Sequence, residues 1–178
     1  GGTNFVYDNT RKLRYADLDY NFNVKYVDLG EKYGKVAYID EGQGEQTILF
    51  LHGISTNLKL FIPQVEYLKK HYRVIALDMP GYGKSTYKSN VNYQFSYHYH
   101  GVITFINTLK LKNLILAGLS YGGGMAVAVS NVPRLDIKKV VLMAPWGLQD
   151  FNSEDRDFFR KNLRNFVKIK VTSDEMIE

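Results

Sequence analysis

The residues best suited to chemistry in this sequence surround Ser120, which stands between two glycines in Gly118-Leu119-Ser120-Tyr121-Gly122. An apolar run (114–117) precedes this segment, and a run of small and apolar residues (125–129) follows it. The pattern predicts a buried strand that turns abruptly into a helix, with Ser120 at the turn. Only very small side chains fit beside such a turn, which accounts for the two glycines. A serine held there, next to the amides that begin a helix, could attack a carbonyl carbon.

Two further motifs follow predicted buried strands. His52-Gly53 comes directly after the predicted buried strand 47–51, and Asp78-Met79-Pro80-Gly81-Tyr82-Gly83-Lys84-Ser85 comes after the predicted buried strand 73–77. The second motif is dense in glycine and proline, which predicts a loop. Together with the segment around Ser120, these motifs resemble, in order and in spacing, the three N-terminal signatures of the α/β-hydrolase superfamily. The resemblance extends over about residues 24–146.

The resemblance implies a serine hydrolase that cleaves a carboxylic ester or a related acyl bond through an acyl-enzyme at Ser120, without a cofactor. A carboxylesterase or lipase is the default, and amide hydrolysis, C–C hydrolysis and perhydrolysis remain open. The resemblance also implies that the backbone amides of Ile54 and Tyr121 form the oxyanion hole, with Ser55 in place of Ile54 if the loop register differs by one. It assigns structural roles to the remaining motif residues: His52, Gly53, Asp78, Gly81, Gly83, Ser85, Gly118 and Gly122.

The sequence offers no base in the expected position. In this family the acid and the histidine follow the serine, whereas all four histidines precede Ser120: His52, His71, His98 and His100. Asp150 is the only acid shortly after the last predicted strand, and an ordinary surface aspartate is the better interpretation. We therefore expect these 178 residues to be the N-terminal part of a hydrolase, with the triad acid and histidine on polypeptide outside this sequence.

Other functions fit the sequence less well. Gly83-Lys84-Ser85 resembles the end of a nucleotide-binding loop, but Asp78 stands where that motif needs glycine. Ser120 replaces the second glycine of a dinucleotide-binding motif in 118–124, so no nucleotide is expected. An aspartate at that position would indicate dehalogenase or epoxide hydrolase chemistry, whereas serine favours acyl substrates. A non-catalytic α/β-hydrolase-fold receptor or interaction module remains the alternative, because the histidine is missing.

Periodicity predicts two hairpin strands followed by alternating strands and helices. Expected strands are 23–29, 35–40, 47–51, 73–77, 114–117 and 139–144, and expected helices are 61–70, 93–109 and one that ends near 131. This order predicts a three-layer α/β/α sandwich with a mostly parallel sheet of the α/β-hydrolase type, without the family's C-terminal strands. The last strand would then lie at a bare sheet edge, which a complementary C-terminal fragment or a second copy could cover.

The expected domain organisation has three parts. Residues 1–22 are predicted to be an N-terminal arm over the domain surface, 23–147 the hydrolase core, and 148–178 the start of a lid, with a helix over 155–168. The hydrophobic fraction of 45 % and the length of 178 residues suit one globular domain.

Composition limits the partners that we expect. The net charge of +5 comes from dispersed lysines and arginines without a nucleic-acid recognition motif, and no apolar run reaches membrane-spanning length. With no cysteine, and with His98 and His100 diverging in a predicted helix, no metal site is expected. The expected partner is a small acyl substrate. The compartment stays open: the cytoplasm is favoured, and a secreted or periplasmic location would need a removed signal.

Overall fold

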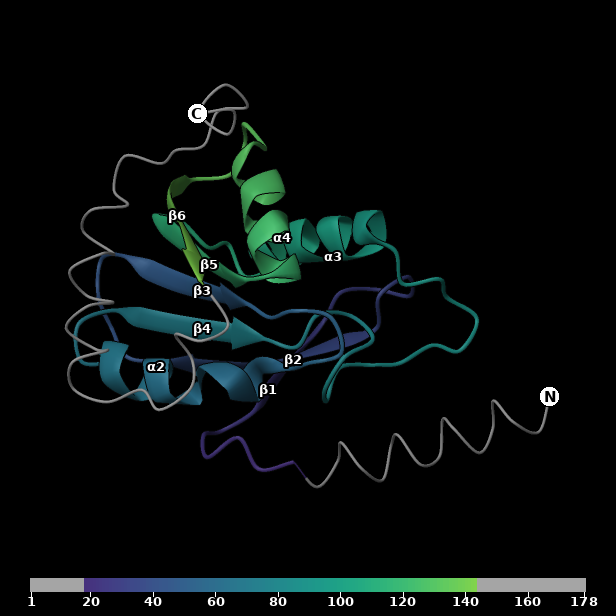
Figure 1. The fold of residues 1–178 in the computed structure, drawn as a ribbon, viewed down its shortest axis with the longest axis horizontal. Coiled ribbons are helices and arrows are strands. Elements are labelled where there is room, and N and C mark those ends of the chain that lie inside the picture. Colours follow the sequence, from purple (N-terminus) through teal and green to yellow (C-terminus); the bar gives the residue numbers. More distant parts are fainter. Residues whose placement is uncertain (1–17, 144–178) are drawn as a thin grey trace.

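The computed structural model describes residues 18–143, which form a six-stranded sheet with helices on both faces (Figure 1). The predicted strands and helices of this part are confirmed, with boundaries shifted by one or two residues. In chain order, the elements are β1 (Lys25–Asp28), β2 (Lys35–Glu41), β3 (Thr47–Leu51), the short 3₁₀ helix η1 (Leu58–Phe61), α2 (Ile62–Leu68), β4 (Arg73–Leu77), α3 (Phe95–Thr108), β5 (Leu114–Leu119), α4 (Tyr121–Ser130) and β6 (Ile137–Met143).

The sheet has the strand order β1-β2-β4-β3-β5-β6. Strand β2 pairs antiparallel with β1 and β4, whereas β4, β3, β5 and β6 run parallel to one another. The carboxyl ends of parallel strands meet at one edge of a sheet, so the residues after β3, β4 and β5 lie at that edge. These residues begin with His52, Asp78 and Ser120, one from each predicted motif.

Each face of the sheet has its own hydrophobic core. In β3, Leu49 and Leu51 pack toward α3 and α4, whereas Ile48 and Phe50 pack toward α2. Alternate side chains of a strand point to opposite faces, and both faces are covered. This is why β3 is apolar from Ile48 to Leu51, and the observed architecture is the predicted three-layer α/β/α sandwich.

One residue of the predicted arm belongs to the core. Tyr20 is 1 % exposed and packs against the α2 side of the sheet, and its hydroxyl donates a hydrogen bond to Asp78 Oδ2 at 2.6 Å. Residues 18–22 are therefore anchored to the sheet through Tyr20, whereas the rest of the predicted arm, residues 1–17, lies outside the described residues. A lone tyrosine in a polar segment carries no periodic signal that would have predicted this contact.

The C-terminal predictions concern residues outside the described part. Within 18–143, β6 pairs only with β5 and so forms one edge of the sheet. The predicted lid of 148–178, its helix over 155–168 and Asp150 lie beyond the described residues.

The turn between β5 and α4 brings main chain against main chain. A Cβ atom on Gly122 would lie 2.1 Å from the carbonyl oxygen of Leu51, at the end of β3, and one on Gly118 would lie 2.1 Å from the carbonyl oxygen of Gly122. Real Cβ atoms do not approach other atoms so closely. The two glycines that flank Ser120 in the sequence are therefore required by this contact, as the motif predicted.

Gly122→Ala should destabilise the fold by an amount on the order of 3 kcal/mol, because the added methyl group can fit only if β3 and α4 move apart. Gly124→Ala is the matched control. It lies two residues further along α4, is exposed, and has nothing within 4 Å of its Cβ position. The control should instead stabilise the helix by about 0.5 kcal/mol or more. Urea denaturation of both variants tests this, and equal effects would contradict the close contact.

Candidate active site

Ser120 lies at the carboxyl edge of the sheet with a strained backbone. Its φ of 53° and ψ of −114° are unusual for a residue with a side chain, and a conformation of this kind costs on the order of 1 to 3 kcal/mol. Its carbonyl oxygen accepts hydrogen bonds from the amides of Gly123 and Gly124, so it begins α4 directly. Ser120 itself is exposed. The fold thus presents one serine to solvent at the start of a buried helix.

The loop after β3 runs beside Ser120. A Cβ atom on Gly53 would lie 3.9 Å from Ser120 Cβ and 3.5 Å from the carbonyl oxygen of Leu119. Ile54 follows, and its side chain is 58 % exposed. Within the described residues, the amides of Ile54 and Tyr121 donate no hydrogen bond to a protein acceptor. The two amides that the resemblance implies as oxyanion donors are therefore without a protein acceptor in this part of the chain, and their role stays a prediction.

The peptide group between Gly53 and Ile54 is held from its carbonyl side. The Gly53 oxygen accepts a hydrogen bond from His52 Nδ1 at 2.8 Å and another from Thr56 Oγ1 at 2.6 Å. The peptide is trans, so its N–H points away from its C=O. Fixing the oxygen therefore fixes the direction of the Ile54 N–H. Ser55, the alternative donor, has a left-handed φ of 60°.

His52 is buried and neutral, and its ring forms hydrogen bonds with two different loops. Its Nε2 accepts a hydrogen bond from the Met79 amide at 2.9 Å, so Nδ1 carries the proton that is donated to Gly53. Burial lowers the pKa of His52 from 6.5 to about 4, against the opposing effect of the hydrogen bond to Gly53. Because both nitrogens are occupied, His52 links the loops after β3 and β4 and has no nitrogen free to act as a base for Ser120.

Asp78 organises the loop that follows β4. Its carboxylate accepts hydrogen bonds from the backbone amides of Leu58 and Lys84, both at 2.8 Å, in addition to the one from Tyr20. Burial raises the pKa of Asp78 to about 6, although these three donors act in the opposite direction. The carboxylate thus gathers three chain segments at one buried point.

The other residues of this motif close the loop around Asp78. A Cβ atom on Gly83 would lie 2.2 Å from the Asp78 carboxylate, and one on Gly81 would lie 2.4 Å from the Tyr93 ring. Both glycines also have positive φ, which disfavours any side chain. Ser85 donates to the Asp78 carbonyl oxygen at 2.6 Å and accepts from the Ala37 amide at 2.9 Å. The loop of residues 78–85 is therefore rigidly held against β2.

None of the other histidines is placed to serve Ser120 as a base. His98 is buried, with Nδ1 at 2.9 Å from the Tyr121 hydroxyl and Nε2 at 3.0 Å from the Pro80 carbonyl oxygen. His71 precedes β4 at the opposite edge of the sheet, and His100 is exposed on α3. The contact from His98 to Tyr121 was not predicted, because nothing in the sequence pairs two residues that lie 23 positions apart.

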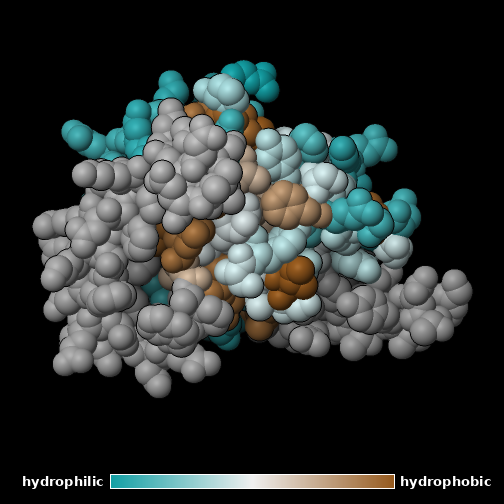
Figure 2. All heavy atoms as spheres, turned by 45° about the horizontal axis from the view of Figure 1, so that its top comes forward, coloured by the Kyte–Doolittle hydropathy of each residue, from teal (hydrophilic) through white to brown (hydrophobic). Residues whose placement is uncertain are grey.

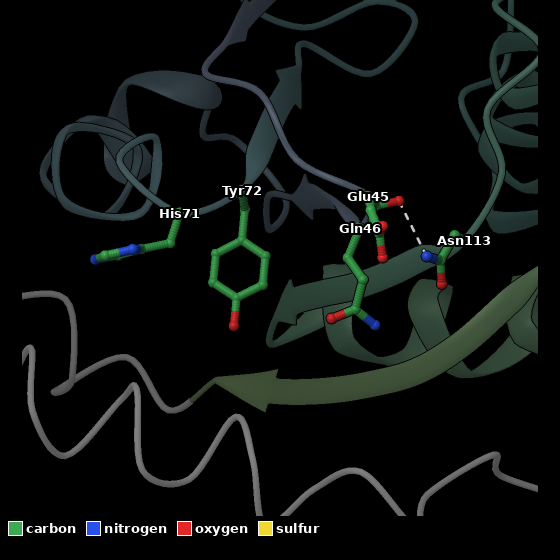
Figure 3. A pocket seen from close by; sticks show the side chains of 5 residues that line it. All are labelled: Glu45, Gln46, His71, Tyr72 and Asn113. Atoms are coloured by element: carbon green, nitrogen blue, oxygen red, sulfur yellow. Dashed lines mark hydrogen bonds between the residues drawn. The ribbon is translucent and has the colours of Figure 1, made fainter.

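A polar hollow of about 440 Å³ lies at the other edge of the sheet (Figure 3). Its lining residues precede β3, β4 and β5, and the Asn113 side-chain amide donates a hydrogen bond to the Glu45 carbonyl oxygen there. The hollow is lined by Glu45, Gln46, His71, Tyr72 and Asn113. It contains none of the motif residues and is separate from the candidate site.

Residues 18–143 contain neither a metal-binding cluster nor a membrane-spanning helix. No group of three or more histidine, aspartate or glutamate side chains in this range is arranged to hold a metal ion. The helices of the same range are all too short or too polar to cross a membrane.

Comparison with known families agrees with this geometry. The alpha/beta hydrolase fold family matches residues 46–170, which include all three motifs. The chain belongs to the α/β-hydrolase fold family. Among the relatives that it matches are proteins named as a hydrolase, a haloalkane dehalogenase and esterases.

Individual relatives cover several hydrolase chemistries. The (E)-2-((N-methylformamido)methylene)succinate hydrolase of Acinetobacter baylyi is 40 % identical over 102 residues, which are 57 % of this chain and 38 % of that protein. A putative esterase/lipase of Mycoplasma genitalium is 29 % identical over 126 residues, 68 % of this chain and 47 % of that protein. The haloalkane dehalogenase DpaA of Paraglaciecola agarilytica superposes with a TM-score of 0.63 at 32 % identity, over 72 % of this chain and 46 % of that structure. The chain thus spans less than half the length of these hydrolases.

The neutral state of His52 gives a testable pH dependence. An unfolded histidine takes up a proton near pH 6.5, whereas His52 in the fold does so only near pH 4. Its contribution to stability is therefore fully present above about pH 6.5 and is lost as the pH falls toward 4. Asp78 acts in the opposite sense between about pH 6 and 3.8, because the folded state takes up its proton first.

NMR titration of the His52 ring protons measures this state directly, without the opposing contribution of Asp78. We expect a midpoint near pH 4, with Nδ1 protonated and Nε2 unprotonated above it. A midpoint near the ordinary value of 6.5 would show that the ring is not held as described.

Proposed function

We propose that this chain carries the nucleophile and the oxyanion hole of a serine hydrolase that acts on a carboxylic ester or a related acyl bond. One observation carries the proposal. The exposed Ser120 is held in a strained conformation at the carboxyl edge of the sheet, beside the loop that contains Gly53 and Ile54. Among the described residues, the amides of Ile54 and Tyr121 have no protein acceptor, which supports their proposed role as oxyanion donors. Strain of this kind persists where the surrounding structure enforces it, and it is concentrated at functional sites.

The chemistry follows from these groups. Ser120 Oγ attacks the substrate carbonyl carbon, and the carbonyl oxygen becomes an oxyanion in the tetrahedral intermediate. The Ile54 and Tyr121 N–H groups donate hydrogen bonds to that oxygen, and the N-terminal end of α4 adds a favourable field. Departure of the leaving group gives an acyl-enzyme, which water then hydrolyses. The serine proton goes to a general base, for which no described residue is proposed.

The residue type at the turn selects among the chemistries of the relatives. A serine nucleophile forms acyl-enzymes with esters, thioesters and amides, whereas an aspartate would be expected for haloalkane or epoxide substrates. Ser120 therefore favours acyl transfer, with an ester as the default substrate and an amide as the nearest variant. The predicted lid over 148–178 would adjust the acyl-group preference.

Apolar side chains around the turn support a substrate with an apolar portion. Ile54, Phe95 and Leu142 are each exposed by 42 % or more. Phe95 contacts the Tyr121 ring at a centroid distance of 5.6 Å, and Leu142 Cδ2 would lie 3.4 Å from a Cβ atom on Gly123. Hydrophobic side chains also reach the surface on the face drawn in Figure 2. Burying such exposed groups against an acyl chain would be favourable.

Labelling of the full-length protein with a fluorophosphonate probe tests the proposal. The probe should attach covalently to Ser120, and Ser120→Ala should abolish both labelling and ester hydrolysis while leaving the unfolding midpoint nearly unchanged. Ser89→Ala, which alters another exposed serine, is the matched control and should label like the wild type.

Two results would contradict the proposal. Labelling that persists in Ser120→Ala would place the nucleophile elsewhere. A folded full-length protein that neither reacts with the probe nor hydrolyses esters would favour the non-catalytic receptor or interaction module.

A further inference from the structure

We propose that His98 is a positioning residue for the oxyanion hole, because it ties Tyr121, the first residue of α4, to the loop of residues 78–85. This inference rests on the proposed function, in which the Tyr121 amide is one of the two oxyanion donors. His98 comes from the middle of the chain and is not part of any of the three motifs.

The hydrogen bonds define the direction of the link. Pro80 offers only a carbonyl oxygen, so His98 Nε2, 3.0 Å away, must be the protonated nitrogen. In a neutral ring Nδ1 is then an acceptor, and the Tyr121 hydroxyl donates to it across 2.9 Å. Burial lowers the pKa of His98 and raises the pKa of Tyr121 to about 12, which keeps both groups in these neutral states. The Tyr121 hydroxyl therefore donates to His98, and His98 donates to the Pro80 carbonyl oxygen.

Aromatic packing prevents the His98 ring from turning out of this position. The Tyr93 ring stacks on it with an interplanar angle of 13° and a centroid distance of 5.8 Å, and the Tyr82 ring lies at 5.2 Å. The Tyr97 ring meets it edge-on at 6.2 Å. His98 has no exposed surface. The acceptor for the Tyr121 hydroxyl is therefore fixed in space.

Tyr121 is consequently held both at its main chain and at its side-chain hydroxyl. Its main chain follows the strained Ser120, and its hydroxyl is bound to His98. Phe95 packs edge-on against its ring at 5.6 Å. A residue anchored in this way resists the small rotation that would relieve the strain at Ser120 and turn the Tyr121 amide away from the oxyanion.

The second donor is tied to the same loop. His52 connects the Met79 amide to the Gly53 carbonyl oxygen, which sets the Ile54 N–H, while His98 connects Pro80 to Tyr121. Met79 and Pro80 are neighbours in the chain. Two buried neutral histidines, His52 and His98, thus connect both proposed donors by hydrogen bonds to the same short segment, Met79-Pro80.

The test removes the link with little change of volume, in the full-length protein. Tyr121→Phe deletes only the hydroxyl, His98→Phe removes both hydrogen bonds while keeping an aromatic ring, and the double variant completes a cycle. Tyr97→Phe is the matched control, because it keeps the ring that meets His98 and loses only a hydroxyl, which donates to the carbonyl oxygen of Lys32 outside the proposed link. The measurements are the rate of fluorophosphonate labelling at Ser120, kcat and KM for a simple ester, and the unfolding midpoint.

We expect Tyr121→Phe to lower the labelling rate and kcat roughly 10-fold, since a small misplacement of a catalytic group is costly, with KM changed less than about twofold. The double variant should be no slower than the slower single variant, because both changes break one link. Tyr97→Phe should keep the wild-type kcat. A merely structural role would lower the unfolding midpoint and leave kcat of the folded fraction unchanged.

The outcomes separate this inference from the proposed function. If the wild-type protein is labelled at Ser120 and Tyr121→Phe reacts at the same rate, the positioning role is wrong and the proposed function stands. If the wild-type protein is not labelled at all, the proposed function fails, and this inference fails with it. Additive effects of His98→Phe and Tyr121→Phe on kcat would also overturn it, even if the His98 variant is less stable.

Discussion

The contact between the first turn of α4 and the end of β3 is the constraint on which the rest of the structure depends. Because Gly122 has no side chain, the main chain of α4 rests directly on the carbonyl groups of Leu51 and His52. This approach forces the abrupt turn at Ser120 and brings the loop after β3 alongside it. Two segments that are almost 70 residues apart in the chain are thereby placed within a few ångströms. As a result, the backbone of Ser120 is strained, and the surrounding packing maintains this strain.

The loop of residues 78–85 supplies the fixed frame against which these two segments are aligned. Asp78 gathers hydrogen bonds from Tyr20, Leu58 and Lys84, so an early tyrosine, the start of η1 and the loop itself meet at one carboxylate. A buried carboxyl group is expensive unless such donors surround it. The arrangement gives this part of the molecule a rigid polar centre between two hydrophobic cores. If a substrate binds at Ser120 as proposed, none of its binding free energy would be needed to order these loops.

The sequence predicted the features that depend on residues close together in the chain. Apolar runs located β3, β4 and β5, and glycine spacing located the turn at Ser120, because strand burial and close main-chain contacts leave their mark on neighbouring residues. It did not reveal that Tyr20 reaches Asp78 or that His98 reaches Tyr121. These contacts join residues 58 and 23 positions apart, and their geometry depends on how α3 and the N-terminal segment pack. Side-chain pairings of this kind have no periodicity, so residue type alone marks them as ordinary tyrosines and histidines.

The paired hydrogen bonds on the Gly53 carbonyl oxygen have a consequence for how such a site can change in evolution. A main-chain N–H is not replaced when a side chain is mutated, so a substitution does not change this donor group directly. Hydrogen bonds accepted by the carbonyl of the same peptide polarise that group and make its N–H more acidic. The side chain of Thr56, which shares that oxygen with His52, offers a means of grading the donor without moving the backbone. The donor strength of a main-chain N–H is in this way linked to the side chain of one partly exposed residue.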